Sequence, residues 1–286
     1  MKEKKKEISA YQRVQTARHK DRPKVMDYID ALFDDFIELS GDRLGKEDLS
    51  LLGGIASFHG MPVTVIGHRK GKNLDENVKY NFGMTSPEGY RKALRLMKQA
   101  EKFNRPVITF IDTPGAYPGM EAEENGQSIA IATNIAKMSN LKVPIISIVT
   151  GEGSSGGALA IGVSDRIWML ENAIYAVLSP EGFASILWKD SKRVKEACEV
   201  MNITADSLKK FGIVDDVISE VKPITSEDGF KMMIEELDGK LEKELASLKK
   251  MDKEDLVQKR YEKYRHIEGE RAPKETTNGE VLKWAD

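Results

Sequence analysis

The chain has 286 residues, 40% of them hydrophobic and 31% charged, and its formal net charge at pH 7 is −2. This composition provides a substantial core, and the low net charge excludes a global field that would attract nucleic acid or a membrane. The single cysteine, Cys198, excludes an internal disulfide and a four-cysteine zinc site, and no apolar run approaches the roughly 18 residues of a membrane span. We therefore expect a cytoplasmic protein with no membrane segment and no metal site.

The first segment, residues 1–45, is expected to be helical. Apolar residues recur there at spacings of three and four, which is typical of one helical face. The predicted helix begins near Pro23 and ends at Ser40-Gly41, and its apolar positions are Val25, Met26, Ile29, Leu32, Phe33, Phe36 and Ile37.

The second segment, residues 46–222, alternates between strand and helix patterns, which predicts an α/β fold with crossover connections. Residues 53–59 and 62–67 read as paired strands around His59-Gly60. The apolar runs 106–111 and 143–149 read as buried strands, and 167–170 and 173–177 as further short strands. Helices are predicted over 87–104, with Tyr90, Ala93, Leu94, Met97 and Ala100 inward, and over 122–139.

The third segment, residues 223–286, is predicted to contain charged helices and, after Gly269, a loosely ordered tail. One apolar stripe runs along it, and it can pack on its own domain, which we favour, or on a partner chain. The stripe consists of Phe230, Ile234, Leu237, Leu241, Leu245 and Leu248.

The stretch VTGEGSSGGALAIG (149–162) contains the pattern G-x-S-x-G around Ser155, which is typical of the nucleophile of serine hydrolases. The same stretch follows a strand and opens a helix, so its glycines can equally bring backbone N–H groups close to an anion. They can also serve only to pack the helix on the sheet. A hydrolase needs a histidine after the serine, and His266 alone follows it, in a charged segment. We therefore favour the anion site.

A second glycine turn lies in FIDTPGAYPG (110–119), where Asp112 to Gly115 fit D-x-x-G. A GTPase would also need a phosphate-binding loop, and GHRKGKN (67–73) departs from that pattern. The remaining interpretation is a turn at the carboxyl end of a strand, where α/β sheets bind ligands. If the two strands are neighbours, Gly115 will lie beside Gly156-Gly157. The basic cluster Arg69, Lys70 and Lys72 either meets substrate phosphates or an acidic partner, or is a solvated loop.

Several long blocks together resemble one family, the α subunits of bacterial acetyl-coenzyme A carboxylase carboxyltransferases. The resemblance covers roughly residues 22–214. Its blocks are Gly41-Asp42-Arg43, IGHRKGKN, NFGMTSPEGYRKALRLM, ITFIDTPGAYPG, AEENGQSIA, GEGSSGGALAIG and SPEGFASILWKD. It implies a crotonase or ClpP-like superfold, with N-terminal helices and charged C-terminal helices around the core.

The family's reaction, as the resemblance implies it, transfers a carboxyl group from carboxybiotin on a biotin carboxyl carrier protein to acetyl-CoA. The product is malonyl-CoA, used in fatty acid synthesis. The backbone N–H groups of Gly156 and Gly157 are then expected to hold the biotin oxyanion. Further substrate-binding residues are expected at Gly153, Ser155 and Ala158, at Gly115 and Ala116, and at Arg69 and Lys72. Ser154 stands where the family pattern has glycine, and a positive φ there would cost on the order of 1 kcal/mol.

The resemblance also implies partners. The four-cysteine zinc ribbon belongs to the family's β subunit, so no zinc and no covalently bound cofactor is expected on this chain. An α₂β₂ heterotetramer is expected, with the carrier protein and biotin carboxylase in the wider complex, and this chain alone should be nearly inactive. The alternatives are a component acting on another acyl-CoA such as propionyl-CoA, a hydrolase using Ser155, and a non-catalytic scaffold.

Overall fold

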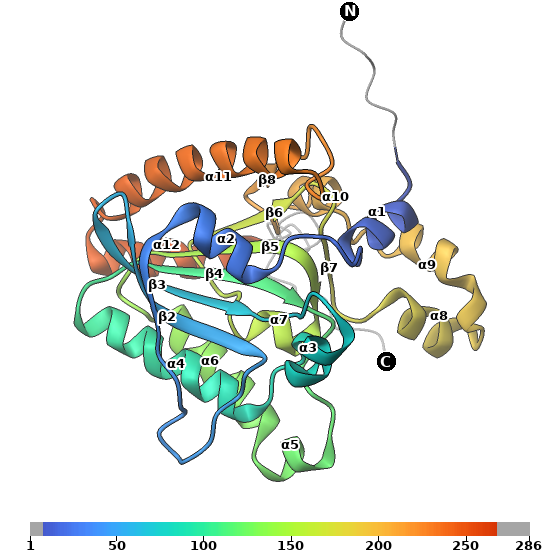
Figure 1. The fold of residues 1–286 in the computed structure, drawn as a ribbon, viewed down its shortest axis with the longest axis horizontal. Helices are drawn as coiled ribbons and strands as arrows, with labels where there is room; N and C mark the ends of the chain where they lie inside the picture. Colours follow the sequence, from blue (N-terminus) through green and yellow to red (C-terminus); the bar gives the residue numbers. More distant parts are fainter. Residues whose placement is uncertain (1–7, 268–286) are drawn as a thin grey trace, which may run out of the picture.

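One twisted sheet organises the molecule, which we describe from a computed structural model covering residues 8–267 (Figure 1). Its main path runs in the order β1-β2-β3-β4-β5-β6-β8, and β7 pairs with the far end of β5. The strands are β1 (Asp34–Glu38), β2 (Leu51–Phe58), β3 (Met61–His68), β4 (Val107–Thr113), β5 (Ile145–Ser154), β6 (Arg166–Leu170), β7 (Ile174–Ala176) and β8 (Asp216–Ile218).

The sheet changes character at β3. The first three strands are antiparallel, and β2 and β3 form the predicted hairpin, whose turn residues His59 and Gly60 both have positive φ. Two positive φ values suit the twist of a tight hairpin, which confirms the turn read from the sequence. From β3 onward the pairs are parallel, so β4 and β5 lie side by side and end at the same edge.

Helices cover both faces of this sheet. Figure 1 shows α4 (Pro87–Lys102) and α6 (Gln127–Ser139) packed together below it, and α11 (Glu227–Leu248) above it. The remaining helical segments are α1 (Ala10–Ala17), α2 (Val25–Leu32), α3 (Leu74–Lys79), η1 (Asn81–Gly83), α5 (Met120–Glu124), α7 (Ser155–Leu159), α8 (Pro180–Trp188), η2 (Ser191–Arg193), α9 (Val194–Val200), α10 (Ala205–Lys210) and α12 (Lys253–His266). No helix within residues 8–267 has the length and apolar content needed to cross a membrane.

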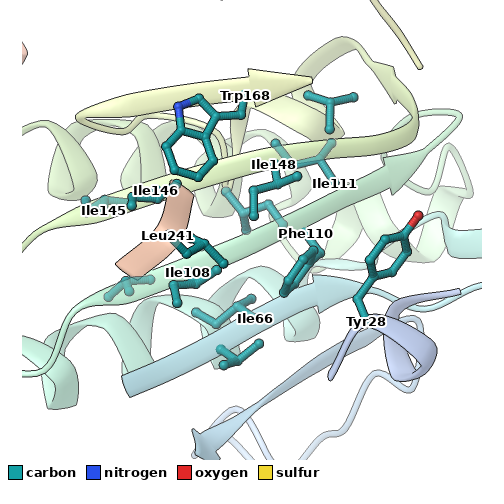
Figure 2. Close-up of a cluster of buried hydrophobic side chains, with 14 of the residues drawn as sticks. Tyr28, Ile66, Ile108, Phe110, Ile111, Ile145, Ile146, Ile148, Trp168 and Leu241 are labelled. Atoms are coloured by element: carbon teal, nitrogen blue, oxygen red, sulfur yellow. The ribbon is translucent and has the colours of Figure 1, made fainter. Parts of the chain in front are cut away.

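One cluster of buried side chains draws on all three segments of the sequence. Figure 2 shows Tyr28 from α2, Phe110 and its neighbours from the central strands, and Leu241 from α11. The Tyr28 and Phe110 rings stack with centroids 5.6 Å apart. The C-terminal stripe therefore packs on its own chain, as favoured. Its members Leu237, Leu241, Leu245 and Leu248 are buried, while Phe230 and Ile234 are partly buried.

The predicted N-terminal helix is wrong in its second half. Helix α2 ends at Leu32, and Asp34–Glu38 form β1, an edge strand paired antiparallel with β2. The helical spacing of Phe36 and Ile37 is overridden because β1 supplies hydrogen-bond partners to an otherwise open sheet edge. Ile37, expected to be inward, is 62% exposed.

Three further boundaries differ from expectation. The predicted helix over 122–139 is two helices, α5 and α6, because Gly126 at φ +83 interrupts the helical path. Strand β5 continues five residues past its predicted end at Val149, through the first half of the glycine motif. In α4, Leu94 is only half-buried, while the other four predicted inward positions are buried. The tail after Gly269 lies outside the described residues.

Candidate active site

The two glycine turns touch. A Cβ added to Gly157 would lie 2.6 Å from both the Ala116 nitrogen and the Gly115 carbonyl carbon. This approach leaves no room for a side chain, so the two backbones pack directly against each other. The prediction that the turns after β4 and β5 are neighbours is confirmed. It follows from the parallel pairing of the two strands, because parallel neighbours end at one edge.

The turn after β4 is closed by its own threonine. Thr113 Oγ1 donates to the Gly115 carbonyl oxygen at 2.7 Å and accepts from the Gly115 N–H at 3.1 Å. Gly115 has φ +146, in the region that favours glycine, and among residues 8–267 no heavy atom other than those of its chain neighbours lies within 4 Å of its added Cβ. Ala116 comes next and is partly buried against the small cluster of Tyr90, Ala130 and Ala160. The Gly115 side of the turn is therefore open space next to the contact with Gly157.

The turn after β5 places its strain one residue later than expected. Ser154 is buried and extended, with φ −121, so it carries no positive-φ penalty. Ser155 instead has φ +57 and is exposed. It begins α7, in which Gly156 is half-buried and Gly157 and Ala158 are buried. Since the first N–H groups of a helix have no partner inside the helix, those of this turn can bind an anion at the sheet edge.

Gly153 lies at the end of β5 and is enclosed. A Cβ there would come within 2.8 Å of the Tyr175 ring and 3.2 Å of Val149. Gly153 is therefore required for packing between β5 and β7, and it sits behind the turn. Its contact with a substrate, like that of Ser155 and Ala158, stays a prediction.

The structure provides no base for a Ser155 nucleophile. Within residues 8–267 no histidine hydrogen-bonds to Ser155. His266 Nδ1 contacts the Glu262 carbonyl oxygen on α12, and His59 Nε2 contacts Asp238 Oδ1 at 2.9 Å beside α11. The serine-hydrolase alternative therefore lacks the proton acceptor that it requires.

A histidine that the sequence analysis does not single out lies beside the turn that contains Gly157. His68, the last residue of β3, is 1% exposed and lies against backbone groups of Gly157 and Phe110. Burial, opposed by the nearby Asp112 carboxylate, lowers the pKa of His68 to about 3, so its imidazole is neutral at pH 7. Neither ring nitrogen has a well-formed hydrogen bond within the described residues. The sequence signal that could have identified His68 is its position at the end of a predicted strand, where side chains are buried.

The basic residues of the 67–73 loop bind different partners. Arg69 binds Glu38 at 2.7 Å and lies 5.3 Å from the centroid of the Tyr80 ring. Lys72 is exposed and binds Asp27 at 2.7 Å. Lys70, which was not singled out from its neighbours, binds Asp112 at 2.7 Å directly behind the glycine turns. Whether Arg69 or Lys72 contacts a substrate stays a prediction.

The most prominent cavity of the described residues lies beside the glycine turns' sequence neighbours and not at the turns themselves. A cavity of about 470 Å³ is lined by residues of the 46–49 loop, Tyr117 and α5, and no glycine of either turn lines it. No group of His, Cys, Asp or Glu within residues 8–267 could hold a metal ion. The turns themselves present backbone N–H groups, which can donate hydrogen bonds.

Two solved structures of carboxyl-transferring and decarboxylating enzymes share this fold. The chain superimposes on transcarboxylase 12S with a TM-score of 0.59 at 23% identity, covering 74% of this chain and 41% of that one. It superimposes on a Pseudomonas malonate decarboxylase hetero-tetramer with a TM-score of 0.62 at 15% identity, covering 78% and 89%. The chain thus shares the α/β fold of these two proteins, which agrees with the predicted fold class.

Sequence comparison defines the family. Residues 1–268 match the family described as acetyl co-enzyme A carboxylase carboxyltransferase-like, and the chain belongs to it. It is 57% identical over 261 residues to the acetyl-coenzyme A carboxylase carboxyl transferase subunit alpha of Clostridium acetobutylicum, covering 91% of this chain and 95% of that one. The Halalkalibacterium halodurans subunit is 57% identical over 260 residues, covering 91% and 80%. The predicted family and carboxyltransferase function are confirmed over the alternative acting on another acyl-CoA.

Proposed function

We propose that this chain supplies the biotin side of a carboxyltransferase site that transfers a carboxyl group to acetyl-CoA, giving malonyl-CoA. The observation that carries the proposal is the contact between the two glycine turns. Gly157 lies against the Gly115–Ala116 peptide at a distance that excludes any side chain, at the edge where the parallel strands end. Such an arrangement preorganises backbone donors without side-chain chemistry.

The N–H groups of Gly156 and Gly157 are the proposed donors to the oxygen of the biotin ring. Carboxybiotin, presented by its carrier protein, supplies the carboxyl group. The residues here fit that partner, because the open side of Gly115 leaves space beside the turn and the first N–H groups of α7 have no partner within the helix. Donors fixed by packing act where negative charge develops and need no reorganisation. Ser155 and Ala158 complete the turn, and Ala116 borders the same space.

The acyl-CoA side of the site is proposed to belong to a β subunit in an α₂β₂ heterotetramer. The relatives are named as alpha subunits, and one structural neighbour is a hetero-tetramer in complex with coenzyme A. From the family resemblance alone, we also propose that the zinc site and the second oxyanion hole belong to the β subunit, and that the biotin carboxyl carrier protein and biotin carboxylase are separate partner chains. The cytoplasmic location stays a prediction.

The division of the chain is also kept as a proposal. Segment 46–222 would carry the catalytic turns, with 1–45 and 223–286 as supporting segments. Support comes from the position of both turns in 46–222 and from the packing of α2 and α11 on the shared core.

The test is the reverse reaction, in which malonyl-CoA and a soluble biotin derivative release acetyl-CoA. It is run with this chain alone, the β subunit alone, and the assembled mixture. We expect turnover in the mixture alone. Methylmalonyl-CoA, run in parallel, is expected to react more slowly, and Ser155→Ala is expected to keep measurable turnover because the proposed donors are backbone N–H groups and not the Ser155 hydroxyl. No turnover in a mixture shown to be assembled would contradict the proposal.

A further inference from the structure

The strand that leads into the catalytic turn is irregular. Strands β4 and β5 pair in register up to Ile111 and Val149, and pairing resumes between Thr113 and Gly153. Residues 150–152 of β5 therefore lie opposite Asp112 alone. A bulge of this kind bends a strand and redirects the residues after it. Ser154 and the α7 turn come directly after this bulge, so its shape determines where the Gly156 and Gly157 N–H groups point.

Asp112 fills the bulge from the β4 side. Its Oδ1 accepts the Glu152 N–H at 2.9 Å and the Lys70 ammonium at 2.7 Å. Gly151 permits this approach, since a Cβ there would lie 2.5 Å from the same oxygen. Burial alone would raise the pKa of Asp112, but the Lys70 charge and the Glu152 N–H hold it below its ordinary value. The carboxylate is thus charged, buried and bound to the bulge backbone.

Two arginines bind the bulge from the other side. Arg22 Nε donates to the Thr150 carbonyl oxygen at 2.7 Å, and its guanidinium pairs with buried Glu220. Arg18 Nη2 donates to Glu152 Oε1 at 2.6 Å. Both arginines come from the N-terminal segment, whereas Lys70 comes from the loop after β3. The bulge is held by side chains from three distant parts of the sequence.

We propose that Lys70 and Asp112 are positioning residues for the carboxyl-transfer reaction. They touch no substrate, but by fixing the bulge they set the direction of the Gly156 and Gly157 N–H groups, so the inference rests on the proposed function of those groups. Because the Lys70 side chain passes Gly83, where a Cβ would lie 2.9 Å from its Cγ, its path to Asp112 is also fixed. A pair that only stabilised the fold would affect unfolding and leave turnover unchanged.

The experiment compares Lys70→Met with Lys263→Met in the complex assembled with the β subunit. Lys263 pairs with Asp215 far from the turns, and the two pairs have similar exposure: 17% and 13% for Lys70–Asp112, 12% and 27% for Lys263–Asp215. We expect Lys70→Met to lower kcat about 10-fold with KM for malonyl-CoA within about twofold, since donor direction matters in the transition state. Lys263→Met should lower the melting temperature and leave kcat unchanged.

Two additional measurements separate positioning from general stability. Lys70→Arg keeps the charge and is expected to recover most of the lost turnover, whereas Asp112→Asn is expected to resemble Lys70→Met. Hydrogen exchange followed by mass spectrometry should show faster exchange over residues 150–158 in Lys70→Met, and over α12 in Lys263→Met. Exchange needs no activity, so it tests the bulge even if the wild-type complex proves inactive. Wild-type kcat and unchanged exchange in Lys70→Met would overturn the inference.

Discussion

Each end of β5 is bound by a buried arginine that pairs with a carboxylate, but the surroundings of the two arginines differ. At the amino end, the fully buried Arg260 of α12 binds both oxygens of Asp165, which in turn accepts the Ile145 N–H. At the carboxyl end, buried Arg22 pairs with Glu220 and donates to the carbonyl of Thr150. Each guanidinium thus binds one carboxylate and nearby backbone carbonyls.

The difference lies in what surrounds each arginine. Arg260 also donates to the carbonyls of Met138, Leu141 and Val143, so it ties α12 to the end of α6 and to the loop that leads into β5. Around Arg22 the strand is bulged, rich in glycine and followed by the turn that we propose to be catalytic. A buried charge therefore anchors a helix at one end and binds the bulge before the proposed oxyanion site at the other. The comparison predicts that mutations at the amino end affect stability and those at the carboxyl end affect turnover.

The largest effect is expected for Arg260→Met. Its removal leaves the Asp165 carboxylate buried without its partner, together with unpaired carbonyls, which typically costs about 3–5 kcal/mol. Urea unfolding of the full chain measures this loss against Lys259→Met, which removes an exposed charge from the same helix. The folded, assembled variant should keep the wild-type kcat. A loss of stability no larger than that of Lys259→Met would break the comparison.

Gly157→Ala is expected to lower turnover, whereas Arg260→Met is expected to lower stability. Its methyl group would meet the Gly115–Ala116 backbone at 2.6 Å and push the two turns apart, so we expect kcat to fall about 100-fold from the misplaced donors. Reverse-reaction kinetics on the assembled complex provide the measurement. Turnover equal to wild type in an assembled variant would remove the oxyanion role from this turn.

The pH dependence of stability should also distinguish the carboxyl end. The pKa of His68 is lowered in the folded state to about 3. At pH values between 3 and 6.5 the unfolded chain therefore binds a proton at His68, whereas the folded chain does not. His68 therefore favours folding above its unfolded pKa of 6.5, and this contribution is lost as pH falls toward 3, by about 1.4 kcal/mol for each pH unit.

The measurement compares urea unfolding of wild type and His68→Gln at several pH values between 6.5 and 4. Other groups that titrate in this range affect both proteins, so the difference between the two curves isolates His68. As pH falls, we expect the free energy of unfolding of the wild type to decrease more steeply than that of His68→Gln. The difference in slope should correspond to about one additional proton bound by the unfolded wild type. Parallel curves would show that the imidazole is solvated or paired in the folded protein.

The smallest effect is expected for Gly239→Ala, which also serves as the control for Gly157→Ala. Gly239 lies within α11, is exposed, and has no heavy atom within 4 Å of its added Cβ. Alanine there should stabilise the protein by about 0.5–1 kcal/mol, because glycine loses more backbone freedom in a helix. Thermal unfolding tests this, and kcat should not change. Destabilisation would indicate that α11 is not a regular helix at this point.

The amino-acid sequence by itself determined the parts of this protein that depend on local pattern. The hairpin at His59-Gly60, the buried strands 106–111 and 143–149 and the α4 helix follow from periodicity and turn residues. The neighbouring glycine turns follow one step further, because consecutive parallel strands end at one edge. The family followed from long motifs, which carry more information than any single pattern.

The tertiary structure alone decided the partners and backbone conformations of the residues around those turns. Phe36 and Ile37 have helical spacing, but pairing with β2 makes them a strand. Arg69, Lys70 and Lys72 are close in sequence but pair with different carboxylates. Lys70 pairs with Asp112 beside the glycine turns, whereas Arg69 pairs with Glu38 and Lys72 with Asp27. Ser155, and not Ser154, has a positive φ, two residues after strand pairing resumes beyond the bulge in β5. Each outcome depends on contacts between residues distant in the chain, and local sequence carries no record of those contacts.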